Sequence, residues 1–143
     1  RIVRDYDASL PDRRGDREQL IQALLNVVRN AAQAIVAARR RPDDPPGEIT
    51  LRTRVARFAT IARRMHRLAL ELQVIDNGPG IPPELRERVF YPLVSGREGG
   101  TGLGLTLAQS YVQQHGGTIE CESQPGRTLF RILLPVDDKK ADA

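Results

Sequence analysis

The chain has 143 residues, of which 28% are charged and 40% hydrophobic, with a formal net charge of +4. This size and composition are typical of one globular domain. No apolar run approaches the roughly 18 residues of a membrane span. We therefore expect no membrane contact. The basic residues are scattered and only three Tyr and three Phe are present, so we also expect no nucleic-acid partner.

The single cysteine, Cys121, excludes an internal disulfide and favours a reducing, cytoplasmic location. Its alternating sequence context predicts a packed or half-exposed strand side chain. No signal peptide is visible, and the chain opens on Arg1 without an initiator Met. We therefore expect residues 1–143 to be one domain of a longer protein, with a frayed tail at 137–143.

The first third of the chain predicts a strand followed by a long helix. Residues 2–6 form a short apolar strand before Pro11. Asp16 is a typical helix N-cap, with Glu18 in the first turn. Apolar residues recur at helical spacing through 17–38 and give one apolar face. The polar, proline-rich stretch 39–47 ends this element.

The middle of the chain predicts two strands and a long loop. Alternating apolar residues mark strands at 48–58 and 67–76, while 59–66 is either a hairpin connection or a continuation of both strands. Residues 77–101 hold several glycines and prolines, with a short helical patch at 83–88. A loop of this length is usually functional. We expect 81–100 to be a mobile lid.

The last third predicts a helix at 102–115, ended by Gly116 and Gly117, and a hairpin of strands 118–122 and 128–134 turning at Pro125-Gly126. Strands occur in adjacent pairs and helices are few. This order favours an α+β fold, a two-layer sandwich in which helices cover one face of a mixed, mostly antiparallel sheet.

Three short segments could carry chemistry. Asn26 and Asn30 lie four residues apart, so both point from one face of the helix. Their amide oxygens could serve a hard cation such as Mg²⁺, or the pair could be a solvent-facing polar stripe. On this pair alone both interpretations stay open.

Asp76 ends an apolar strand and is followed by Asn-Gly-Pro-Gly. These residues form turns readily, and a turn is the plain interpretation. The alternative is a pocket, in which Asp76 accepts a hydrogen bond from an adenine amine and Gly78 and Gly80 let the backbone approach a ligand closely.

Residues 99–105, Gly-Gly-Thr-Gly-Leu-Gly-Leu, open a helix. They match neither the dinucleotide fingerprint nor the P-loop. Free amides at a helix N-terminus attract phosphate, and a simple hinge is the alternative.

In this order, the three segments resemble the N, G1 and G2 boxes of the catalytic ATP-binding domain of bacterial sensor histidine kinases. That domain belongs to a superfamily that also includes DNA gyrase B and MutL. The stretch 90–93, Phe-Tyr-Pro-Leu, is similar to the family's F box. The closing segments 116–119 and 126–130 are similar to its terminal hairpin. The sequence of residues 90–105 further resembles the corresponding segment of the NtrB-type kinases of nitrogen regulation.

The resemblance implies ATP and Mg²⁺ as cofactors, with Asn30 as the metal ligand and Asn26 supporting metal and phosphates. It implies that Asp76 reads adenine, that Gly78 and Gly80 shape the base pocket, and that Arg97 lies near the γ-phosphate. The expected phosphate-binding residues are Gly100, Thr101, Gly102, Leu103 and Gly104. In the full-length homodimer, the resemblance implies transfer of the γ-phosphoryl to a histidine on a separate dimerisation domain. An NtrC-like response regulator would follow, with a PII-type signalling protein as regulator.

Two departures bear on these expectations. Hydrolytic relatives carry a glutamate where this chain has Asn26, and a neutral amide cannot act as a general base. Neither His66 nor His115 has the sequence context of a phosphoacceptor; His115 is better interpreted as a helix-end cap. Transfer is therefore favoured over a stand-alone ATPase. A serine kinase acting on an anti-sigma antagonist and a non-catalytic nucleotide-sensing module remain as alternatives.

Overall fold

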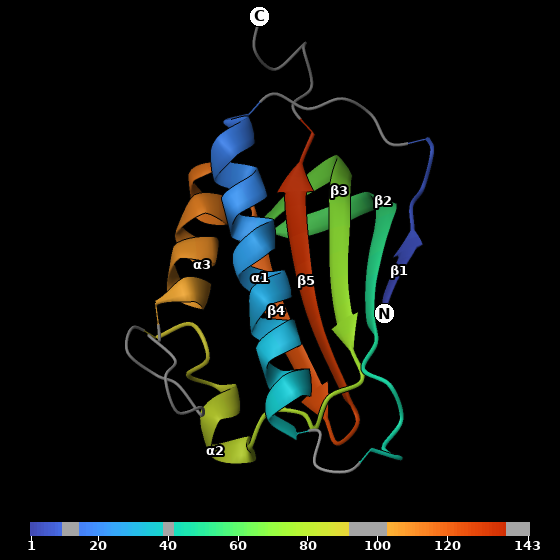
Figure 1. The fold of residues 1–143 in the computed structure, drawn as a ribbon. Coiled ribbons are helices and arrows are strands. Elements are labelled where there is room, and N and C mark those ends of the chain that lie inside the picture. The colour runs from blue at the N-terminus through green and yellow to red at the C-terminus, as the bar shows by residue number, and fades with distance from the viewer. Residues whose placement is uncertain (10–14, 39–41, 92–102, 137–143) are drawn as a thin grey trace, which may run out of the picture.

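The computed structural model describes residues 1–9, 15–38, 42–91 and 103–136. In chain order its elements are β1 (Ile2–Asp5), α1 (Arg17–Ala38), β2 (Ile49–Ile61), β3 (Arg64–Asp76), α2 (Pro83–Arg86), α3 (Gly104–Gln114), β4 (Thr118–Gln124) and β5 (Arg127–Pro135). The strands form one sheet, and α1 and α3 lie side by side over one of its faces (Figure 1). The predicted α+β sandwich is confirmed.

The sheet has five strands in the order β1-β2-β3-β5-β4. β1 pairs parallel to β2, and every other pair is antiparallel. The ambiguous stretch 59–66 continues both strands, so β2 runs three residues beyond its predicted end at 58. The hairpin turns at Ala62 and Arg63, whose φ angles of 50° and 67° are the left-handed values that a two-residue turn of this kind needs.

The core lies between the sheet and the two long helices. From α1 it takes Ala23, Val27 and Ala31, none more than 1% exposed. These three residues are spaced by four, which is the one-face pattern of an amphipathic helix. The strands and α3 contribute the remaining buried residues, among them Val74, Ala108, Val112, Ile119, Phe130, Ile132 and Leu134.

By length and composition alone α1 could cross a membrane, with a mean hydropathy of 1.3, although it lacks an unbroken apolar run. The core helix of a globular domain meets the same criterion. One face of α1 packs on the sheet and α3, whereas Ile21, Leu25 and Val36 on this helix are exposed.

The ends of α1 and α3 are tied together. Asp16 caps α1 as predicted, its Oδ1 accepting from the amide of Gln19 at 3.2 Å. His115, just after α3, accepts at Nε2 from the amide of Asp16 at 2.8 Å, and its Nδ1 lies 2.8 Å from the carbonyl oxygen of Tyr111. Because a carbonyl can only accept, Nδ1 carries the proton. The helix-end role predicted for His115 therefore extends to α1.

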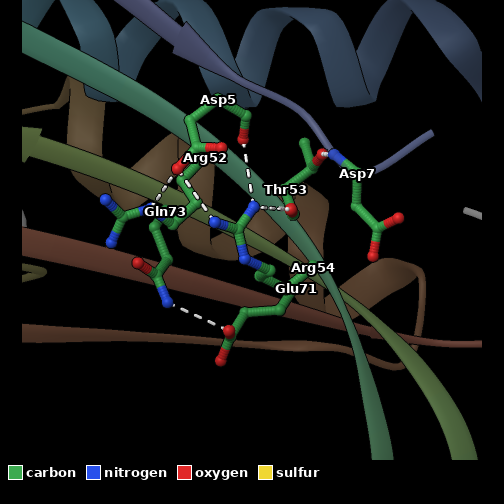
Figure 2. A network of polar contacts seen from close by, with 7 residues as sticks. All are labelled: Asp5, Asp7, Arg52, Thr53, Arg54, Glu71 and Gln73. Atoms are coloured by element: carbon green, nitrogen blue, oxygen red, sulfur yellow. Dashed lines mark hydrogen bonds and ion pairs between the residues drawn. The ribbon is translucent and has the colours of Figure 1, made fainter. Parts of the chain in front are cut away.

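The sheet face away from the helices carries a charged network (Figure 2). Asp5 accepts from Arg52 at 2.9 Å and from Arg54 at 2.8 Å, and hydrogen bonds from Arg54 and then Arg52 lower the pKa of its carboxyl. Further along the same face Arg131 pairs with Glu71 at 3.1 Å and with Glu122 at 3.2 Å. These arginines form ion pairs within the fold, so part of the arginine content of the chain has a structural role.

Candidate functional site

Asp76 is the least exposed charged side chain among the described residues. It ends β3, where the register places it between Ile49 of β2 and Thr128 of β5. It is 4% exposed, and its Oδ1 accepts from the amide of Gly78 at 2.9 Å. Burial raises the pKa of this carboxyl, and the Gly78 hydrogen bond opposes that rise. Asp76 forms no ion pair with any described residue.

The turn after Asp76 is held from both sides. Asn77 Oδ1 accepts from the amide of Glu48 at 2.8 Å, and Asn77 Nδ2 donates to the carbonyl of Pro46 at 3.1 Å. On the other side Ser123 Oγ accepts from the amide of Ile81 at 2.7 Å. The turn is therefore fixed to the residues just before β2 and to β4.

The two glycines of this turn meet protein atoms. A Cβ on Gly78 would lie 2.9 Å from Asp76 Oδ1, and one on Gly80 would lie 2.6 Å from the carbonyl oxygen of Gln124. Gly80 also has a φ of +87°. We predicted that these glycines allow close approach of a ligand. In the structure, the backbone of the turn lies close to Asp76 of β3 and to Gln124 of β4.

The two asparagines on α1 have different surroundings. Asn26 is 8% exposed, so a solvent-facing polar stripe does not describe it. Its Nδ2 donates to the carbonyl of Gly104 at 3.0 Å, and its Oδ1 accepts from Gln22 Nε2 at 2.8 Å. Asn30, one turn further on, is half-buried. Sequence reasoning missed Gln22, since a glutamine on an amphipathic helix carries no distinguishing signal.

α3 begins beside Asn26, which donates to the carbonyl of its first residue, Gly104. Its N-cap position is Leu103, no side chain caps the helix, and a Cβ on Gly104 would meet nothing within 4 Å. Its first amides are therefore not used by a capping side chain, as an anion site at a helix N-terminus requires. The other predicted phosphate-binding residues, Gly100, Thr101 and Gly102, and the predicted lid residue Arg97 lie outside the described residues.

The described part of the predicted lid is well anchored. Phe90 packs edge-on against Phe130, with ring centroids 6.1 Å apart and planes at 81°. Its carbonyl accepts from Thr106 Oγ1 of α3 at 2.8 Å, and Val89 is buried. Aromatic packing and the Thr106 hydrogen bond thus join the end of the described stretch to β5 and α3. The mobility expected for 81–100 stays a prediction. The remainder of the lid falls outside the described residues.

A second pair of polar residues beside Asp76 was not predicted. Thr128 is 4% exposed, and its Oγ1 lies 2.9 Å from Ser123 Oγ. In the sequence both look like ordinary hairpin residues. Only the strand register brings Thr128 next to Asp76 and Ser123 next to Thr128.

Residues 15–138 match the family model described as "Histidine kinase-, DNA gyrase B-, and HSP90-like ATPase". The chain belongs to this family. Its relatives include "Sensory histidine kinase/phosphatase NtrB" of Salmonella typhimurium, 54% identical over 136 residues that cover 95% of this chain and 37% of the relative. The NtrB of Rhodobacter capsulatus is 47% identical over 97% of this chain and 38% of its own length. The chain thus spans little more than a third of these kinases.

Solved structures agree with this assignment. The mycobacterial sensor histidine kinase MprB is 28% identical, with a TM-score of 0.70 over 94% of this chain and 84% of that one. The nucleotide-free catalytic domain of the histidine kinase ThkA is 25% identical, with a TM-score of 0.71. The chain is an ATP-binding catalytic domain of the NtrB-like histidine-kinase type.

This family assignment raises the question of a metal site. No group of three or more His, Cys, Asp or Glu side chains is gathered within the described residues. Mg²⁺ does not need such a group, since it commonly keeps several waters and binds one or two protein oxygens together with substrate phosphates. The chemistry of an asparagine amide oxygen, such as that of the half-buried Asn30, fits that mode.

Proposed function

We propose that this domain binds Mg²⁺–ATP between α1, the end of β3 and the start of α3, and that it donates the γ-phosphoryl group to a histidine on the kinase's dimerisation domain. The observation that carries the proposal is Asp76. It is a buried carboxylate with a raised pKa and no cationic partner among the described residues. Folding alone does not favour such a group, whereas an adenine amine is a donor that suits it.

Each element contributes one part of the recognition. Asp76 Oδ1 accepts from Gly78, so Oδ2 is the oxygen we assign to the adenine N6 amine. Asn30 supplies an oxygen to Mg²⁺, which neutralises charge on the phosphates when bound. The phosphates are assigned to the backbone amides of residues 100–104, of which Gly104 begins α3. Arg97 is assigned to the γ-phosphate.

Phosphoryl transfer rests chiefly on positioning and on neutralising charge. Asn26 is an amide and cannot abstract a proton from water at neutral pH. Its two polar atoms are also engaged with Gly104 and Gln22. Both points favour transfer to a protein acceptor over hydrolysis of ATP.

The partners we propose follow from the relatives. The acceptor is the dimerisation domain of the same protein, which is a homodimer, and the phosphoryl group passes on to an NtrC-like response regulator. A PII-type signalling protein is the regulator. Two pairs of exposed apolar side chains, Ile21 and Leu25 on α1 and Leu103 and Leu107 at the start of α3, are each 43–46% exposed. We assign them to the surface that meets the acceptor domain. The domain acts in the cytoplasm, where ATP is supplied.

Calorimetric titration of the chain with ATP and ADP, each with and without Mg²⁺, tests the proposal. Wild type should bind both nucleotides. Asn30→Ala should lose more affinity for ATP with Mg²⁺ than for ADP without metal, since its proposed contact is with the metal. Gln113→Ala, at an exposed position near the end of α3, is the matched control and should bind as wild type does. Equal losses with and without metal would indicate a folding defect in Asn30→Ala.

A further inference from the structure

Asn26 joins two segments that lie far apart in the sequence. Its Nδ2 donates to the carbonyl of Gly104, 78 residues further along the chain, and its Oδ1 accepts from Gln22. The orientation of this amide follows from its partners. A carbonyl oxygen only accepts, so the NH₂ group must face Gly104, and the oxygen is left for the donor of Gln22.

The two linked segments are the ones that the proposed site needs to hold in register. Asn30 lies one turn beyond Asn26 on α1, and Gly104 is the first residue of α3. The link is partly shielded from water: Asn26 is 8% exposed, and Gln22 and Gly104 are half-buried. Breaking such a hydrogen bond leaves a poorly solvated partner unpaired, which costs free energy. The link therefore constrains where α3 starts relative to α1.

From this geometry we infer that Gln22 is a positioning residue for phosphate binding. By donating to Asn26 Oδ1, Gln22 keeps the NH₂ group of Asn26 on the carbonyl of Gly104 and so holds the first turn of α3 against α1. Asn26 then acts as a connector between the two helices, and the metal contact is assigned to Asn30, one turn further along α1. The inference rests on the proposed function, because it concerns the phosphate end of the same site.

Two substitutions separate this role from simple packing. Gln22→Met keeps the length of the side chain and removes the donor. Gln22→Glu keeps the shape but can only accept when ionised, so it draws the NH₂ group of Asn26 to itself and turns Oδ1 towards the carbonyl of Gly104. If Gln22 orients Asn26, Glu is the more damaging substitution at pH 8. If Gln22 only fills space, the two variants behave alike.

The measurement is the dissociation constant of each variant for ATP, ADP and adenosine, with Gln113→Ala as the control. Gln22→Met should bind ATP and ADP roughly 2- to 10-fold more weakly, the effect of one neutral hydrogen bond, and Gln22→Glu more weakly still. Adenosine, which lacks phosphates, should bind all variants equally. In an Asn26→Ala background, Gln22→Met should have no further effect, because it acts through Asn26.

Three results would overturn the inference. The first is unchanged affinity of both Gln22 variants for ATP. The second is an equal loss for adenosine and ATP, which would mean that Gln22 supports the whole fold. The third is additivity with Asn26→Ala. If the wild-type chain binds none of the three ligands, the proposed function itself is overturned. The wild-type titration is therefore done before any variant is made.

Discussion

The buried carboxylate of Asp76 is expected to strengthen nucleotide binding and to lower the stability of the nucleotide-free chain. We expect Asp76→Asn to weaken ATP binding roughly 10- to 150-fold, since a hydrogen bond to a charged group is worth about 1.5–3 kcal/mol. The same change should stabilise the nucleotide-free chain at pH 7, because it removes a buried charge. Calorimetry and urea unfolding measure the two effects.

The pH dependence follows from the raised pKa of Asp76. The folded chain holds the proton more tightly than the unfolded chain, so this group favours folding most below its ordinary pKa of 3.8 and loses that contribution as the pH rises. The advantage of Asp76→Asn should therefore shrink on acidification. Asp43→Asn, at an exposed position, controls for loss of a negative charge. Unchanged ATP affinity in Asp76→Asn would remove Asp76 from the site.

Cys121 is predicted to be chemically inert in the folded chain. Burial raises the pKa of its thiol to about 12, with smaller contributions from the carboxylates of Asp76 and Glu122. Because the thiolate is the reactive form, alkylation by iodoacetamide at pH 8 should be at least about 100-fold slower than for an ordinary thiol. Urea unfolding should restore the ordinary rate. Fast alkylation without unfolding would show that the β4 packing around Cys121 opens.

Among the elements, the turn between β3 and α2 is closely constrained by its neighbours. Gly80 and Gly126 have nearly equal φ values, +87° and +85°, but only Gly80 lies against another backbone. Alanine in a left-handed conformation costs about 1–2 kcal/mol. We expect Gly126→Ala to lose about that much stability in urea unfolding.

Gly80→Ala should lose more than Gly126→Ala, because its Cβ would lie 2.6 Å from the carbonyl oxygen of Gln124 and a strand backbone cannot move aside cheaply. It should also bind adenosine more weakly, as the turn carries one wall of the proposed pocket. Equal stabilities of the two variants would mean that the turn shifts freely despite the hydrogen bonds made by Asn77 and Ser123.

For the molecule as a whole, the chain should bind ATP and yet not phosphorylate itself. His115 has both ring nitrogens engaged, with Asp16 and Tyr111, and His66 lies within β3. Incubation with γ-labelled ATP should leave the chain unlabelled. Adding a separately produced dimerisation domain of the same protein should give acid-labile, base-stable label on that domain. Such label on the isolated chain would contradict the prediction.

The sequence by itself determined the elements and the kind of site. Apolar spacing predicted α1 to the residue, because a single buried helix face leaves an unambiguous period. The strand content and the α+β class followed from local patterns of the same kind. The resemblance to histidine kinases rested instead on three short motifs, the Asn26–Asn30 pair and the segments 76–80 and 99–105. Asp76 was singled out because a charged residue that ends an apolar strand contrasts with its neighbours.

Only the tertiary structure decided what each polar residue contacts. Strand register placed Thr128 beside Asp76, and helix packing brought Gly104 to Asn26. The tertiary structure also showed that Gly80 lies against β4 and that Phe90 packs on Phe130 within a stretch predicted to be mobile. These contacts join residues far apart in the chain, and a single sequence records local periodicity but not the partners that burial of the core later imposes.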